Sequence, residues 1–185
     1  MNGDRERQGR ATTPRLYTIG HSTRSFEEFA AALESFAIAC LIDVRTVPRS
    51  RRVPQFNHDS LARALPAVGV EYVHLPELGG WRKPLPDSPN AGWRNASFRG
   101  YADYMLTPEF EAAIEHLMKI AREKPSAVMC AEAVPYRCHR SLIADALTVR
   151  GWEVPHILGV GRAEPHRLTP FAQVDGTRII YPAPA

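Results

Sequence analysis

The sequence predicts an α/β fold: a single domain with a mostly parallel sheet and helices on both faces. Short apolar runs of strand length alternate along the chain with segments whose apolar residues recur at helical spacing. Most of the strand-like runs are apolar throughout, which is typical of parallel strands buried on both faces. The length of 185 residues suits one domain and requires no second core.

The first half of the chain supplies three of the predicted strands. They are residues 16–20, 40–44 and 70–75. A helix is expected between the first two, because Ser25 and Glu28 match a capping box and apolar residues follow at helical spacing. A shorter helical segment near residues 59–65 is expected to end or kink at Pro66.

The second half continues the alternation. Thr107 and Pro108 are an N-cap and a first-turn proline for a helix that runs through Arg122. A further helix is expected before Gly151, between the last two strands of the parallel sheet. Those strands are residues 127–130 and 154–158.

The predicted α/β domain spans residues 15–160, and other segments flank or interrupt it. Residues 1–14 are polar and charged, so we expect a mobile tail rather than a signal peptide. Residues 76–99 contain Gly, Pro, Trp and Arg without periodicity, which makes them a candidate lid. Residues 161–185 form a C-terminal extension, in which residues 178–181 are a possible edge strand.

Composition limits the class of protein. A hydrophobic fraction of 44% with 23% charged residues is typical of a globular domain, and no apolar run has the length of a membrane span. We therefore expect a cytoplasmic protein with no membrane partner. The three cysteines are too few for a disulfide framework, so reduced thiols are expected. The net charge of +3 is too small to indicate nucleic-acid binding by itself.

The densest group of reactive side chains begins at Cys130 and ends at Arg140, between a strand and a helix. Cys138 lies at the helix N-terminus, where the dipole favours an anion and lowers the pKa of a thiol. Either cysteine is a candidate nucleophile, His139 a candidate proton carrier and Glu132 a candidate acid or base. Arg140 is a candidate anion ligand. The structural alternative is a buried thiol, a histidine cap and a surface ion pair.

The same residues could also bind zinc, since thiolate and imidazole suit that ion. However, seven residues separate Cys130 from Cys138, which exceeds the spacing of ordinary zinc knuckles, and there is no second pair. We assign neither a metal nor a cofactor to this segment.

Two other loops are expected at the same edge of the sheet, because the carboxyl ends of parallel strands meet there. His21 and Ser22 follow the first strand and are candidates for proton transfer and ligand binding, or for local turn hydrogen bonds. Asp43 and Arg45 end the second strand, with Arg49 shortly after. We expect the arginines to hold an anion and Asp43 to anchor an arginine or a histidine; a catalytic carboxylate is the alternative.

Aromatic and basic residues extend these candidates. Arg51 and Arg52 continue a cationic wall that suits phosphate or a nucleic-acid backbone, although a solvated loop is the alternative. Trp81 and Trp93 lie among basic residues in the candidate lid and can stack on a base or pack on the core. Tyr101 can direct its hydroxyl group toward the site.

Several blocks occur in a fixed order along the chain. They are residues 18–22, residues 43–45 with Pro48 and Ser50, residues 72–75 with 78–80, residues 101–105, and Cys130 and Glu132 with residues 138–140. Together they resemble the family called domain of unknown function 488. The resemblance runs from about residue 18 to residue 157 and implies a compact α/β domain with these blocks at one site. It implies no reaction type.

We therefore predict an enzyme that acts on a phosphorylated or nucleotide-like small molecule, or on nucleic acid, in a cleft at the strand ends. One cysteine would attack, the arginines at 45, 49 and 140 would hold the anion, and His21 or His139 would move a proton while Glu132 orients it. A noncatalytic nucleotide or nucleic-acid-binding module is the first alternative. The second is a redox protein in which the two later cysteines form a reversible pair. The sequence does not predict the oligomeric state.

Overall fold

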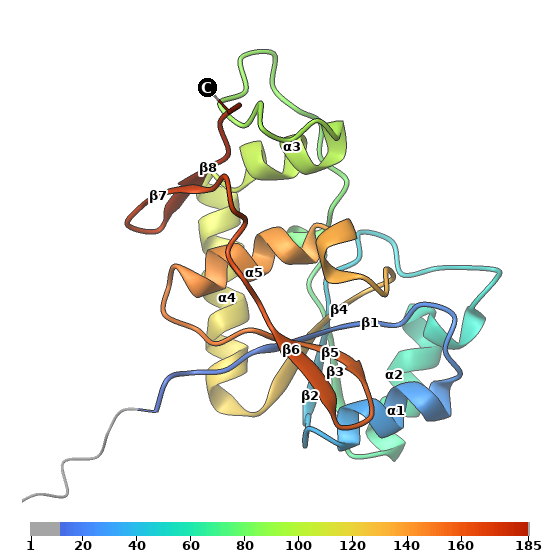
Figure 1. Cartoon of the computed structure of the whole chain (residues 1–185). Helices are drawn as coiled ribbons and strands as arrows, with labels where there is room; N and C mark the ends of the chain where they lie inside the picture. Colours follow the sequence, from blue (N-terminus) through green and yellow to red (C-terminus); the bar gives the residue numbers. More distant parts are fainter. Residues whose placement is uncertain (1–11, 185) are drawn as a thin grey trace, which may run out of the picture.

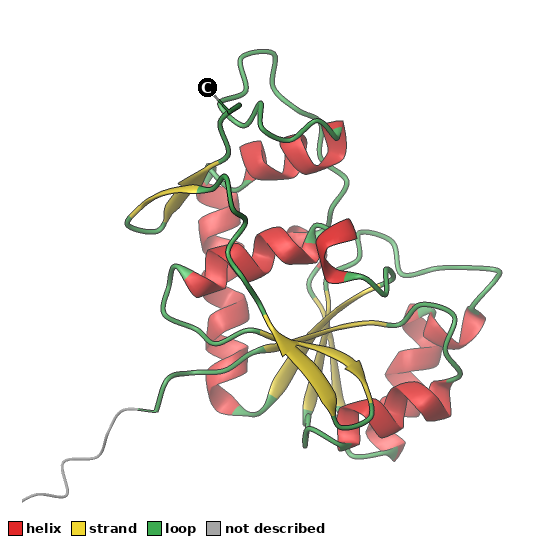
Figure 2. Cartoon of the chain, in the orientation of Figure 1, coloured by secondary structure: helices red, strands yellow, loops and turns green. Residues whose placement is uncertain are grey.

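The computed structural model describes residues 12–184, and the expected tail over residues 1–14 falls largely outside this range. Its main sheet has six strands in the order β3-β2-β4-β1-β5-β6 (Figures 1 and 2). The first five are parallel, and β6 pairs with β5 in the antiparallel direction. The strands of this sheet are β1 (Tyr17–Gly20), β2 (Cys40–Asp43), β3 (Glu71–His74), β4 (Ser126–Cys130), β5 (Pro155–Gly159) and β6 (Arg162–Pro165).

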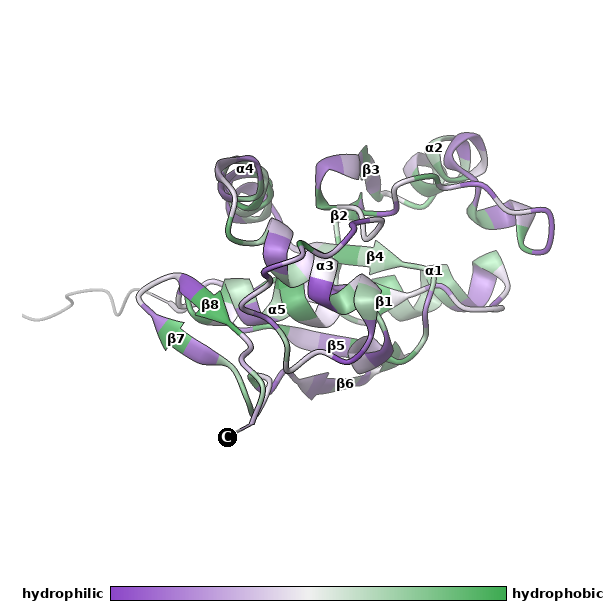
Figure 3. Ribbon diagram, turned by 90° about the horizontal axis from the view of Figure 1, so that it is seen from above, coloured by the Kyte–Doolittle hydropathy of each residue, from purple (hydrophilic) through white to green (hydrophobic). Residues whose placement is uncertain are grey.

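Helices cover both faces of the sheet. They are α1 (Phe26–Glu34), α2 (His58–Ala67), α4 (Pro108–Glu123) and α5 (Arg140–Thr148), whereas α3 (Ala96–Tyr104) lies beyond the sheet, at the top of Figure 1. Seen along the sheet edge, α1 and α2 lie on one side and α4 and α5 on the other (Figure 3). The predicted α/β class with a mostly parallel sheet is therefore confirmed.

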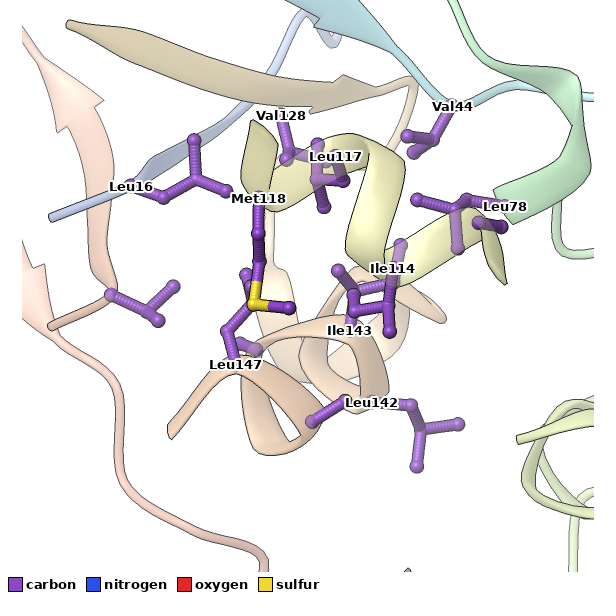
Figure 4. Packing of buried hydrophobic residues seen from close by; sticks show 14 of the residues in the cluster. Leu16, Val44, Leu78, Ile114, Leu117, Met118, Val128, Leu142, Ile143 and Leu147 are labelled. Carbon is purple, nitrogen blue, oxygen red and sulfur yellow. The ribbon is translucent and has the colours of Figure 1, made fainter. Parts of the chain in front are cut away.

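The core follows from this layering. Neighbouring strand residues point to opposite faces, so Leu41 joins the apolar cluster under α1 and α2, while Ile42 joins the cluster under α4 and α5. In the second cluster, the stripe of α4 that carries Ile114 and Leu117 packs beside α5 and below Val128 (Figure 4). Because both faces are covered, every residue of β2 and β4 is buried.

The segment over residues 76–99 has more internal structure than a loop. A 3₁₀ turn, η2 (Pro76–Leu78), begins it, and α3 starts within it at Ala96, with Asn95 as N-cap. The buried carboxylate of Asp103 accepts hydrogen bonds from Ser88 Oγ and Asn90 Nδ2. These bonds anchor the segment to α3.

The C-terminal residues form a separate small sheet. Strands β7 (Gln173–Asp175) and β8 (Arg178–Ile180) pair with each other and not with the main sheet, whose edge is β6. Tyr181, next in the chain, is fully buried, and its hydroxyl group donates to Asp145 of α5. Its backbone also bonds to Asn90 and Gly92, so the C-terminal segment joins α5 to the segment before α3.

The end of β1 passes unusually close to the loop after β4. A Cβ atom on Gly20 would lie 1.8 Å from the carbonyl oxygen of Glu132, a contact that backbone atoms cannot relieve cheaply. Only glycine fits here, and the two loops can therefore meet.

We expect Gly20→Ala to lower the free energy of unfolding by about 3 kcal/mol, because the added methyl group overlaps backbone atoms. Gly159→Ala is the matched control, since a Cβ atom added there would have no other atom within 4 Å and Gly159 also ends a strand of this sheet. The control should change the free energy by less than about 0.5 kcal/mol. Urea denaturation of both variants measures the difference, and equal values would contradict the close approach.

Candidate functional site

Strand register brings three loops to one edge of the sheet. Gly20 of β1 pairs with Cys130 of β4, and Asp43 of β2 pairs with Met129 on the other side of β4. The register continues beyond the strands, because His21 N donates to Cys130 O at 3.0 Å. The loops that begin at Gly20, Asp43 and Cys130 therefore start side by side.

The loop after β4 folds back on itself and brings two thiols together. A 3₁₀ turn, η3 (Pro135–Arg137), reverses the chain, so that Cys138 returns to Cys130 with their Sγ atoms 2.8 Å apart. Both thiols are buried, yet both line a cleft of about 490 Å³, here called the thiol cleft. Other residues that line it are Arg45, Gly80, Trp81, Arg137 and His139.

A buried cation lies beside the thiol pair. The side chain of Arg140 is almost fully buried, and its Nη2 donates to the carbonyl oxygens of Glu132 and Ala133. Among residues 12–184, its Nε and Nη1 atoms have no hydrogen-bond partner, and it forms no ion pair with a carboxylate. An uncompensated buried charge is costly and favours a negative charge nearby.

That negative charge is best placed on Cys130. The hydrogen bond from Cys138 and then the charge of Arg140 hold the pKa of the Cys130 thiol below its usual value, against the effect of burial. The hydrogen bond to Cys130 and burial raise the pKa of Cys138 well above its usual value. These opposite directions favour Cys130 over Cys138 as the thiolate of the pair, with the Cys138 thiol as the hydrogen-bond donor. Cys40 is distant from the cleft, and burial raises its pKa to about 11.

Arg45 is held rigidly at the rim of the cleft. Its Nε and Nη2 donate to the two carboxylate oxygens of Asp43 at 2.9 and 2.6 Å, and Nη2 also donates to the carbonyl group of Phe56. The hydroxyl group of Tyr72 donates to the same carboxylate. Asp43 thus anchors Arg45 and balances its charge, and the remaining Nη1 contacts His21 at 3.2 Å.

His21 supports Arg45. Its Nδ1 lies 2.8 Å from the carbonyl oxygen of Ser22 and must donate to it, so Nε2 is the acceptor for Arg45. Burial lowers the pKa of His21 to about 4. Ser22 itself takes a left-handed backbone conformation, φ 52°, and its N–H donates to Ala131 O. With both ring nitrogens engaged, His21 is a positioning residue in this structure.

His139 is the histidine next to the thiols. Its Nδ1 lies 3.5 Å from Cys138 Sγ, and burial, followed by the charge of Arg140, lowers its pKa to about 4. The imidazole is therefore neutral at pH 7. Gly80 makes room for it, since a Cβ there would lie 2.6 Å from Nδ1. Tyr101 packs beside it, fully buried, and donates its hydroxyl group to Leu78 O, away from the cleft.

Other candidates lie farther out. The exposed Glu132 lines the thiol cleft, and its carboxylate accepts from Val134 N. Arg49 lines a different cleft, together with His58, Arg63 and His74. Arg51 and Arg52 are exposed and line neither cleft. The cationic wall therefore splits, with Arg45 at the thiols and Arg49 elsewhere.

A buried hydrogen-bond chain was not predicted from the sequence. Thr18 Oγ1 lies 2.6 Å from His156 Nδ1, His156 Nε2 lies 2.9 Å from His166 Nδ1, and His166 Nε2 lies 2.7 Å from Asp145 Oδ1. Burial lowers the pKa of His156 to about 3. The chain ties β6 and the segment after it to β1, β5 and α5. The only sequence signal was a pair of histidines ten residues apart, which depends on an unpredicted hairpin.

Two kinds of feature are absent from the part of the chain that the structure describes. Within residues 12–184, no three or more His, Cys, Asp or Glu side chains are grouped so as to hold a metal ion. Over the same range, no helix combines the length and apolar character required to cross a membrane.

Comparison with known proteins gives one match. The family model described as Domain of unknown function DUF488 matches residues 25–147, which include α1 through most of α5. No curated protein and no solved structure matches the chain.

We expect Asp43→Asn to lower the free energy of unfolding by about 3–5 kcal/mol, because it leaves the largely buried Arg45 without its counter-ion. Glu153→Gln is the control: it removes the half-exposed ion pair with Arg15 and should cost less than about 1 kcal/mol. Chemical denaturation at pH 7 compares the two. Similar losses of unfolding free energy in the two variants would show that burial does not make the Asp43–Arg45 pair costlier to break.

Stability should also fall on mild acidification. His21, His139 and His156 have folded pKa values of about 4, 4 and 3, below the usual 6.5, so between these values the unfolded chain binds more protons. Their contribution is complete above pH 6.5 and decreases as the pH falls toward about 4, by up to about 1.4 kcal/mol per histidine per pH unit.

Urea denaturation at pH 7.0 and 5.5 measures this slope. His139→Asn should reduce it, while the exposed His116→Asn should leave it unchanged. A slope that is identical in all three proteins would contradict the assignment of His139 as a neutral, half-buried histidine.

Proposed function

Because the chain belongs to the family described as Domain of unknown function DUF488, a description that names no activity, we propose a function from the site itself. The protein is a thiol-dependent enzyme that acts on a phosphorylated, nucleotide-like substrate, with Cys130 as the nucleophile. We place this activity in the cytoplasm, where thiols stay reduced.

One observation carries the proposal: the 2.8 Å contact between Cys130 and Cys138 at the wall of an open cleft. A purely structural thiol pair has no need of a neighbouring uncompensated guanidinium such as Arg140. Here that cation and the Cys138 hydrogen bond both favour a thiolate, which is the reactive form of cysteine. The pair thus supplies a nucleophile and, beside it, a proton donor.

The reaction can be written with these two groups. The Cys130 thiolate attacks phosphorus, a sulfur–phosphorus bond forms and the bond to the leaving oxygen breaks. The leaving oxygen takes the proton of Cys138. Water then attacks the thiophosphate, which releases phosphate and the Cys130 thiolate, and the water proton returns to Cys138.

Other residues of the thiol cleft would bind the anion. Arg137 is exposed at the cleft and carries no ion pair among the described residues, so it can pair with phosphate oxygens. Arg45 also lines the cleft, but Asp43 balances its charge. We therefore assign Arg45 the role of a rigid part of the cleft wall. Trp81 is 77% exposed there and offers a face for stacking.

A redox role is the second candidate, and the same 2.8 Å separation favours it. In that case a hydroperoxide oxidises Cys130 to a sulfenic acid and is reduced to an alcohol or water. Cys138 then displaces water to form a disulfide, which an external dithiol reduces again.

Variants of Cys138 separate the two functions. Cys138→Ser keeps a hydrogen-bond donor but removes the second sulfur, whereas Cys138→Ala removes both. In a phosphate-ester and nucleotide panel, turnover by the proposed enzyme is lost in Cys130→Ser and reduced in Cys138→Ala. Cys138→Ser retains more turnover than Cys138→Ala, because its hydroxyl group still donates a hydrogen bond to the thiolate. Loss of hydroperoxide reduction in both Cys138 variants, with disulfide formation in the parent, favours the redox role. Turnover that is unchanged in Cys130→Ser would exclude the thiol mechanism.

Alkylation provides a test that needs no substrate. We expect iodoacetamide to modify Cys130 faster at pH 7 than a model thiol of ordinary pKa, and Cys138→Ala to slow this reaction about tenfold by removing the hydrogen bond. Peptide mass spectrometry identifies the modified cysteine, and Cys40 is the internal control for a buried, unreactive thiol. Equal modification of Cys130 and Cys40 would contradict the proposal.

A further inference from the structure

We infer that the thiol cleft is one half of a longer groove, and that the substrate is a phosphate ester of a planar aromatic compound of about nucleotide size. This inference rests on the proposed function and adds the nature of the leaving group. The second half is a cleft of about 660 Å³, here called the aromatic cleft, which is bounded in part by Trp93, Tyr136, Ser141, His166 and Phe171.

Residues that line one cleft are immediate neighbours of residues that line the other at two places. At the first place, Trp93 lines the aromatic cleft and Phe98 the thiol cleft, and the centroids of these rings are 4.8 Å apart. At the second place, Tyr136 lines the aromatic cleft and its chain neighbour Arg137 the thiol cleft. Adjacent Cα atoms are about 3.8 Å apart, so the linings of the two clefts lie within the length of one small molecule of each other.

The two halves differ in chemistry. The thiol cleft contains the thiols and the free guanidinium of Arg137, which suit a phosphate group. The aromatic cleft carries the rings of Trp93, Tyr136 and Phe171, and Tyr136 is 75% exposed. Such faces stack on planar rings, and the cleft volume lies within the usual range for ligand pockets.

The polar groups of the aromatic cleft further define the ligand. All four ring nitrogens of His156 and His166 are engaged in the chain from Thr18 to Asp145. They therefore cannot form hydrogen bonds with the edge of a base without breaking that chain. Stacking on the aromatic rings is therefore expected to be the main contact, while Glu164 and Arg167, which also line this cleft, can pair with polar groups of the ligand.

Protection of Cys130 from iodoacetamide tests the inference without requiring turnover. The probes are inorganic phosphate, adenosine monophosphate and cytidine monophosphate. We expect both nucleotides to protect at concentrations at least about tenfold lower than phosphate. Tyr136→Ala and Phe171→Leu should each raise the protecting concentration of the nucleotides about fivefold or more and leave that of phosphate unchanged. Val160→Ala is the control, because Val160 is an exposed apolar residue that lines neither cleft.

The outcomes distinguish the two proposals. If Cys130 is not reactive, the proposed function fails. If Cys130 is reactive but nucleotides protect it no better than phosphate does, the inference of a longer groove fails while the proposed thiol enzyme stands. The same holds if nucleotides protect Cys130 equally well in the two aromatic-cleft variants and in the parent. Melting temperatures of the variants show that each is folded, and Tyr136 is exposed enough for its removal to leave the core intact.

Discussion

The arrangement of this site depends on a buried carboxylate. Asp43 is fully buried at the end of a central parallel strand, where an unpaired charge would be strongly destabilising. It is compensated by Arg45 and Tyr72, and Arg45 in turn reaches His21 and the backbone of Phe56. One charge thus fixes the loops after β1 and β2 and the turn before α2. The loop after β4 lies between them because β4 lies between β1 and β2 in the sheet.

Arg45 and Arg140 have different electrostatic effects on the site. Arg45 is paired with a carboxylate, so its field is largely cancelled at distances beyond the pair. Arg140 contacts only carbonyl groups, so its charge acts on the nearest ionisable groups, Cys130 and His139. The same guanidinium favours a thiolate on one and a neutral ring on the other. Local charge balance, more than the number of arginines, therefore determines the character of the cleft.

Much of this fold could be predicted, because buried parallel strands produce apolar runs that are visible without any partner. The convergence of the loops at His21, Asp43 and Cys130 followed from the same argument. The register of β1, β4 and β2 agrees with it. Arg49 shows the limit: it is near Arg45 in sequence, but the chain bends at residues 46–47 and Arg49 lines another cleft.

Other features depend on contacts that the local sequence does not encode. Helix α3 has Gly100 in its middle, which argues against a helix; a Cβ there would lie 2.5 Å from Arg82 O, so the glycine serves close packing. The edge strand β6 is mostly exposed and polar, and only its hairpin with β5 brings His166 to His156. Such long-range pairings give no periodic signal.

The position of Tyr181 also affects the order of assembly during synthesis. Its hydroxyl group donates a hydrogen bond to Asp145 of α5, and its backbone bonds to Asn90 and Gly92. The stretch around these two residues leads into one wall of the groove. Tyr181 is about ninety residues after Asn90 in the chain. During synthesis the sheet can therefore form before Tyr181 holds that wall in place. The nascent chain would then carry both thiols of the cleft before the neighbouring wall is held in place.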